Sequence, residues 1–136
     1  MQNRKAGPRM TPQDFPRAFA AAFGAQDADR LAGYLSEDAS LLSLTGAWTE
    51  GRDAARAALG AEFAGIFARA RLVTGKLHQR DLAAGVLLLQ QRFVVSGARG
   101  PGGADLPRFA AMLSALMVAR GDAWQIAALS FSGLAE

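Results

Sequence analysis

The sequence predicts an α+β fold, in which short helices at the N-terminal end pack against a sheet built by the rest of the chain. Two patterns support this prediction. Apolar residues recur at helical spacing over residues 14–24, 28–35 and 53–70. After residue 71 the pattern changes to runs of strand length, which are separated by glycine-containing turns. The helices need a sheet to cover, and the second half of the chain supplies it.

The first helix is predicted to be rich in alanine, with one aromatic side. Phe15, Phe19 and Phe23 recur along it, and Gly24 ends the run. Asp27 is suited to cap the second helix, because its side chain can accept a hydrogen bond from a backbone N–H of the first turn. A brief apolar run at residues 41–44 follows and has the length of a strand.

The third helix is predicted over residues 53–70 and carries one apolar stripe. Glu62 lies largely off this stripe, whose members recur every three or four positions. Phe63 and Phe67 allow two interpretations, because they either fill the core or wall the narrow end of a pocket. The full stripe is Ala55, Leu59, Phe63, Ile66 and Phe67.

Four long antiparallel strands are predicted over residues 72–80, 86–95, 108–120 and 124–131. The connection at residues 97–107 contains four glycines and two prolines, so we expect it to lack regular structure. This segment also lacks the strand–helix context of a phosphate-binding loop, which argues against nucleotide binding.

The strand at residues 108–120 is apolar on both of its faces. One face carries Phe109, Leu113 and Met117, and the other carries Met112 and Leu116. A sheet with one solvent-facing side normally alternates apolar and polar residues. The helices can cover only one face, so we predict that a second copy of the sheet covers the other and that the protein is a homodimer.

The composition is that of one globular domain and excludes several classes of site. The chain has 136 residues, 51% of them hydrophobic, with no cysteine and one histidine. The lack of cysteine excludes disulfides, thiolate metal sites and a cysteine nucleophile. A single histidine excludes a multi-histidine metal centre. We therefore expect no metal and no cofactor.

The excess positive charge is concentrated before Met10. Arg4, Lys5 and Arg9 have no acid among them, whereas the remaining residues carry twelve basic and twelve acidic side chains. We expect a disordered basic tail at residues 1–10, a single domain at residues 11–136 and no nucleic-acid partner. Without a secretory signal or a membrane-spanning apolar run, a cytoplasmic location and no membrane partner are expected. The alanine and arginine content favours a bacterial source.

Four segments, taken together in their order and spacing, carry a resemblance to a known group. They are FAAAFGAQDADRLAGYLSEDASL, TGAWTEGRDAARAAL, RDLAAGVL and the closing DAWQIAALSFS. The chain resembles the SnoaL-like branch of the nuclear transport factor 2-like superfamily, which has a cystatin-like fold. The resemblance implies an α+β cone, with three N-terminal helices packed in a strongly curved, mixed, mainly antiparallel sheet.

The resemblance transfers catalysis less readily than it transfers the fold. Relatives such as polyketide cyclases, epoxide hydrolases and ketosteroid isomerases hold a buried carboxylate at the mouth of the cone. Related sequences often carry a histidine near Leu59 and a polar pair at Ser130 and Phe131. Leucine and phenylalanine cannot transfer a proton, so the usual acid–base residues are replaced in this chain.

Gln90 and Arg92 are the most informative site candidates. They share a face of their strand with Leu88 and Val94, so this face changes from apolar to polar along its length. The resemblance implies that this face lines the cone. A buried arginine then needs a partner, either a protein acid such as Glu50 or Asp53, or the carboxylate or enolate of a ligand. In the alternative interpretation, Arg92 reaches the open end of the sheet and is solvated.

His78 and Arg92 are weak candidates for catalysis. His78 is either a base near neutral pH or a surface residue at a strand end. Tyr34 and Trp48 either rim an apolar site or fill the core. The candidate ligand-binding residues are Tyr34, Trp48, Phe63, Phe67, Gln90, Arg92, Met112, Ser114 and Ser130.

Three functions follow from these observations. The first is a cone that binds a small apolar molecule. The second is a cyclase- or isomerase-type enzyme for a polyketide- or steroid-like substrate. The third is a dimerising accessory domain without a ligand. An open interior with Arg92 unpaired inside it favours the first two functions, and a filled interior favours the third.

Overall fold

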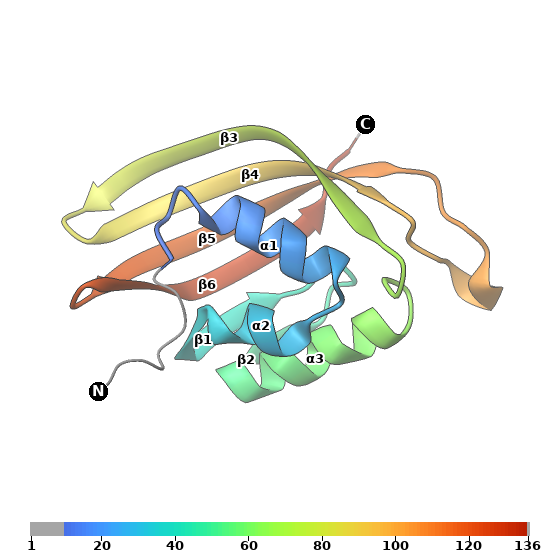
Figure 1. The fold of residues 1–136 in the computed structure, drawn as a ribbon, viewed down its shortest axis with the longest axis horizontal. Coiled ribbons are helices and arrows are strands. Elements are labelled where there is room, and N and C mark those ends of the chain that lie inside the picture. The colour runs from blue at the N-terminus through green and yellow to red at the C-terminus, as the bar shows by residue number, and fades with distance from the viewer. Residues whose placement is uncertain (1–9, 136) are drawn as a thin grey trace.

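The computed structural model describes residues 10–135, so residues 1–9 of the predicted tail lie outside the described part. Three helices precede most of a six-stranded sheet, which confirms the predicted α+β architecture (Figure 1). The elements are α1 (Phe15–Gly24), α2 (Ala28–Gly33), β1 (Leu35–Leu42), β2 (Trp48–Glu50), α3 (Arg52–Ala64), β3 (Arg71–Ala83), β4 (Val86–Ser96), the 3-10 turn η1 (Pro101–Gly103), β5 (Phe109–Arg120) and β6 (Ala123–Gly133).

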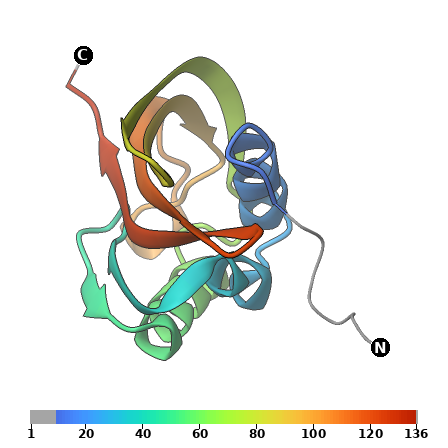
Figure 2. The same cartoon turned by 90° about the vertical axis from the view of Figure 1, so that its left-hand side faces the viewer.

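The sheet is mixed and mainly antiparallel, as predicted, with the strand order β2-β1-β6-β5-β4-β3. Only β1 and β6 pair in parallel among the described strands. The three helices lie on one side of the sheet, and its other side carries no layer of described residues (Figure 2). At one edge β3 contacts α1, and at the other edge α3 packs on β1 and β2. We call the side toward the helices the inner face and the opposite side the outer face.

The helix signals in the sequence place α1 and α2 closely. Phe15, Phe19 and Phe23 are all buried on α1. Asp27 caps α2 as predicted, because its carboxylate accepts a hydrogen bond of 3.0 Å from the backbone N–H of Arg30. The helix ends at Gly33, two residues earlier than expected, because Leu35 already begins β1.

The third helix is shorter than predicted and ends at Ala64. Gly65 takes a non-helical conformation there, and the chain turns back, so that the backbone N–H of Phe67 bonds to the carbonyl of Glu62 at 2.8 Å. This turn keeps the Phe67 side chain buried although its residue lies outside the helix. The apolar spacing therefore continued past the helix without marking its end.

The two strands at the β1–β2 edge were predicted least well. β1 begins at Leu35 instead of residue 41, and the three-residue strand β2, which starts at Trp48, was not predicted. The parallel pairing of Leu41 with Leu129 joins residues that lie far apart in the chain. No local pattern encodes such a pairing. The four-stranded meander β3–β6, whose strands pair with their neighbours in the chain, agrees with prediction.

The helices can be checked for the length and apolar character that a membrane span requires. No helix among residues 10–135 is long and apolar enough to cross a membrane.

Candidate functional site

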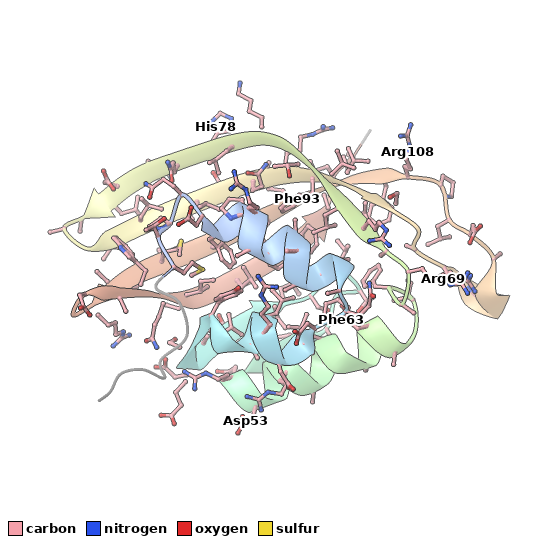
Figure 3. The ribbon with its side chains drawn as sticks, in the orientation of Figure 1. Asp53, Phe63, Arg69, His78, Phe93 and Arg108 are labelled. Carbon is pink, nitrogen blue, oxygen red and sulfur yellow. The ribbon has the colours of Figure 1, made fainter. Side chains whose placement is uncertain are left out.

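Strand β4 shows which side of the sheet faces the helices. Leu89, Gln91 and Phe93 are buried on the inner face, whereas Gln90 is half-buried and Arg92 is exposed on the outer face. In Figure 3, Phe93 lies between the sheet and α1, and His78 on the neighbouring strand projects away from the helices. The prediction that Gln90 and Arg92 line the interior is therefore wrong.

The reason for this error is the side chain of Gln91. It is only 1% exposed, and its Nε2 atom donates to the carbonyls of Gly75 at 2.9 Å and Arg92 at 2.8 Å. A buried amide is tolerated when its hydrogen bonds are made. These bonds fall beside the irregularity of β3 between Thr74 and Leu77, so Gln91 fixes a strand bulge instead of forming a site.

The space between the sheet and the helices is occupied by phenylalanine rings. Phe23 lies 5.1 Å from Phe63, 5.4 Å from Phe67 and 5.9 Å from Phe131, measured between ring centroids. Phe19 lies 5.9 Å from Phe93. These separations are those of packed aromatic pairs. The predicted pocket walls Phe63 and Phe67 are 5% and 1% exposed, and they belong to this packed cluster.

Tyr34 lies at the edge of the same core. Its ring meets Phe15 edge-on at 5.8 Å, and its hydroxyl accepts a hydrogen bond of 3.1 Å from Nε of Arg30. This hydrogen bond to Tyr34 raises the pKa of Arg30. The arrangement anchors α2 against α1, and the interpretation of Tyr34 as a core residue fits these contacts.

The other candidates gather on the outer face. The pairing register aligns His78 with Gln90, Gln90 with Ser114, and Ser114 with Ser130 across four strands. The same row continues through Leu42 to Trp48. Arg92 pairs with Met112 in the adjacent row. Except for Tyr34, Phe63 and Phe67, the structure thus brings the predicted residues to one face, but it is the face opposite the helices.

A shallow groove of about 270 Å³ lies on this outer face beside the exposed ring of Trp48, which is 61% exposed. Three of the predicted ligand-binding residues line it together. Its lining residues are Ser40, Trp48, Leu88, Ser114, Leu116, Ala128, Leu129 and Ser130.

Arg80 and Glu50 stand at opposite edges of the outer face. Arg80 pairs with Leu88 on one side of the sheet, and Glu50 pairs with Ser40 on the other. Within residues 10–135 no ion pair within 4.0 Å joins Arg92 to Glu50, and the strands that carry them are separated by β5, β6 and β1. The expected internal partner for Arg92 is therefore not Glu50.

One polar cluster was missed in the sequence. Glu62 is only 8% exposed, and its Oε2 atom accepts a hydrogen bond of 2.6 Å from Oγ1 of Thr45. Ser43 lies 3.3 Å from the same hydroxyl and accepts from the backbone N–H of Ala47 at 3.1 Å. The cluster ties the β1–β2 turn to α3. Glu62 lies just before Phe63 on the helix, which is the only signal that could have placed it near the core.

The chemistry available on the outer face is binding. His78 and Arg92 are exposed, whereas acid–base catalysis needs a titratable group held against the reacting proton. No three His, Asp or Glu side chains of the described residues lie close enough together to hold a metal ion. Half-buried apolar side chains and uncharged polar groups dominate the face.

Comparison with known proteins places the fold. No protein-family model matches the sequence, and no curated protein sequence matches it. An uncharacterised protein with a cystatin-like fold from Caulobacter vibrioides superposes with a TM-score of 0.82 at 23% identity, over 90% of this chain and 87% of that one. The chain has the nuclear transport factor 2-like, or cystatin-like, fold.

Two further neighbours with this fold carry suggested functions of their own. A protein from Streptomyces avermitilis, suggested to be a dehydratase of the nuclear transport factor 2-like family, superposes at a TM-score of 0.73, with 12% identity over 89% of this chain and 92% of that one. A protein from Thiobacillus denitrificans, suggested to be a calcium/calmodulin-dependent protein kinase type II association domain, reaches 0.75, with 22% identity over 94% and 99%. At such identities the likeness concerns the fold alone.

Proposed function

We propose that this protein is a self-associating accessory domain, which forms a two-fold dimer through the outer face of its sheet. The packed phenylalanine cluster favours this function over a ligand held between the sheet and the helices, because aromatic side chains occupy that space. One neighbour with the same fold is itself a suggested association domain.

The observation that carries the proposal is one row of residues across the outer face. The register aligns Arg80, Leu88, Leu116, Ala128, Ser40 and Glu50, in this order from β3 to β2. The row begins with a cation, ends with an anion and is apolar or small between them. Neither charged end has an ion-pair partner within 4.0 Å among the described residues.

A two-fold axis parallel to the strands makes such a row complementary to itself. This axis reverses the strand order, so β3 of one copy lies opposite β2 of the other, while positions along the strands are kept. Arg80 of each copy then faces Glu50 of its partner. Nearer the axis, Leu88 faces the partner's Ser40, and Leu116 faces the partner's Ala128. An interface of this kind uses the same patch on both subunits, with an apolar centre and a polar rim.

Replacement of Leu116 by glutamate tests the interface at its centre. A buried, unpaired carboxylate is costly, so Leu116→Glu should halve the mass measured by light scattering at micromolar concentration. Leu106→Glu is the matched control, because Leu106 is 37% exposed in the connection between β4 and β5, away from this row. Circular dichroism establishes that both variants are folded. A folded Leu116→Glu variant with the wild-type mass would refute the interface.

A small-molecule site is the second candidate function, and the groove beside Trp48 favours it. Ser114 and Ser130 supply polar groups in an otherwise apolar lining. The dimer would cover this groove, so a ligand held there would compete with dimerisation. Titration of a ring-bearing apolar probe separates the two functions, because the ligand site requires saturable binding that Trp48→Ala abolishes. A cyclase or isomerase activity would need, in addition, turnover that depends on His78 or Arg92.

A further inference from the structure

The connection between β4 and β5 is folded, although its composition predicted irregular structure. Ala98 is 1% exposed, the backbone N–H of Leu106 bonds to the Ala98 carbonyl at 2.9 Å, and Arg99 forms an isolated bridge with Asp105. The backbone N–H of Arg99 also bonds to the carbonyl of Ile66, at 2.9 Å. The connection is therefore docked on the chain that follows α3 (Figure 1).

A groove of about 500 Å³ lies between these two segments. It shares no lining residue with the groove beside Trp48. Its walls are largely apolar, because the side chains of Ile66 and Pro101 line it and most of its other lining residues are glycines. The one charged lining residue is Arg99. The lining residues are Gly65, Ile66, Arg99, Gly100, Pro101 and Gly103.

The guanidinium of Arg99 is incompletely paired. Its Nε atom is buried and has no hydrogen-bond partner among the described residues. Asp105 lies 3.9 Å from Nε, within ion-pair distance but beyond hydrogen-bond distance. Arg69 adds a second cation on this side of the molecule, since its backbone packs on Gly97 and Figure 3 places its side chain toward the connection. Because Nε itself is buried, an anion from outside can reach only the exposed end of the guanidinium, whose side chain is 35% exposed.

We propose that this groove binds a small apolar carboxylate, with its hydrocarbon part between Ile66 and Pro101 and its carboxylate on the guanidinium of Arg99. Arginine presents a planar fork of donors that matches a carboxylate. The volume suits a ring-sized molecule and lies within the range of small-molecule pockets. This site is independent of the outer face and does not require a dimer.

Three probes separate the contributions of charge and of apolar contact. Cyclohexanecarboxylate carries both, cyclohexanecarboxamide lacks the charge, and acetate lacks the ring. In a ¹⁵N-resolved titration at millimolar concentrations, the carboxylate should shift the backbone amides of Ile66, Gly100 and Gly103 saturably. The other two probes should bind at least about tenfold more weakly, because each loses one part of the interaction.

Three substitutions assign the effect to Arg99. Arg99→Gln should weaken cyclohexanecarboxylate at least about tenfold, whereas Arg108→Gln, an exposed arginine outside the lining, should leave it unchanged. Asp105→Asn retains Arg99 and removes the competing carboxylate, so it should tighten binding. This variant guards against a simple loss of loop structure in Arg99→Gln. Any of three results would overturn the proposal: no saturation with cyclohexanecarboxylate, equal binding of the acid and the amide, or weaker binding of the acid to the Asp105→Asn variant.

Discussion

Phe23 is the residue on which the inner packing depends most. Its ring contacts those of Phe19, Phe63, Phe67 and Phe131, and it is 1% exposed. Phenylalanine was recognisable in the sequence as part of an apolar stripe, but the stripe could not distinguish a packed core from the wall of a pocket. That distinction depends on whether rings from α1, α3 and β6 meet, which is a property of the assembled fold.

Replacement of Phe23 by alanine should therefore remove contacts to four rings at once. We expect the free energy of unfolding to fall by about 3–5 kcal/mol, as for other buried phenylalanines. Urea unfolding at fixed protein concentration measures it. Leu82→Ala, at a position that is 51% exposed, should change the value by no more than about 0.5 kcal/mol. Equal effects of the two substitutions would mean that the interior is not packed as described.

The hydrogen bond from Thr45 to Glu62 gives a second test at the scale of single residues. It joins a turn to α3 at 2.6 Å, with the carboxylate largely buried. Thr45→Val should lower the free energy of unfolding by about 1–2 kcal/mol, because the carboxylate loses its donor. Thr45→Val combined with Glu62→Gln forms a double-mutant cycle, and we expect a coupling energy of at least about 0.5 kcal/mol. Strict additivity would show that the bond does not contribute.

At the scale of elements, the capping and termination signals of the helices predicted α1 and α2 correctly. The alternation of side chains along β4 was assigned to the wrong faces of the sheet. Asp27 and Gly24 carry their meaning locally, through capping and helix termination, so α1 and α2 followed from the sequence. Strand β4 is apolar at both odd and even positions, with Gln91 on one face and Gln90 and Arg92 on the other. Placing Gln90 and Arg92 on the inner face implies that Gln91 faces outward, yet its amide is buried and bonds to strand carbonyls within the fold. Without the bulge of β3 this solution cannot be foreseen.

Substitutions at two glycines test the conformation of the β4–β5 connection. Gly97 and Gly102 both have positive φ, at +81° and +75°. A Cβ at Gly97 would lie 2.5 Å from the carbonyl oxygen of Arg69, whereas one at Gly102 would meet nothing within 4 Å. Gly102→Ala should cost about 1–2 kcal/mol through the backbone alone.

Gly97→Ala should cost distinctly more than Gly102→Ala, because the connection must move away from the segment after α3. Thermal unfolding at equal protein concentration compares the two variants. Equal losses of stability would contradict the close docking of the connection on Arg69, and with it the geometry of the groove beside Arg99.

At the scale of the whole molecule, the sheet divides two kinds of surface. Its inner face is closed by helices and rings, whereas its outer face presents half-buried apolar rows with charge at their ends. The two apolar faces of β5 were visible in the sequence and suggested a second copy of the chain. The pattern of charges at the ends of the row was not visible in the sequence. Arg80 and Glu50 share a row only through five strand pairings, one of which is the parallel pairing of β1 with β6.

The pairing of Arg80 with Glu50 of a second copy predicts how variants behave when they are mixed. Arg80→Glu alone places two carboxylates opposite each other, and Glu50→Arg alone places two cations, so each variant should dissociate at low ionic strength. A mixed pair restores both opposite-charge contacts. Added salt should weaken these differences, since exposed charges are screened.

Sedimentation equilibrium of the two variants, separately and in an equimolar mixture, is the most direct measurement. The account predicts a mass near the 14.3 kDa of one chain for each variant alone and about twice that mass for the mixture. The same mass in all three samples would contradict dimerisation through the outer face in the proposed orientation.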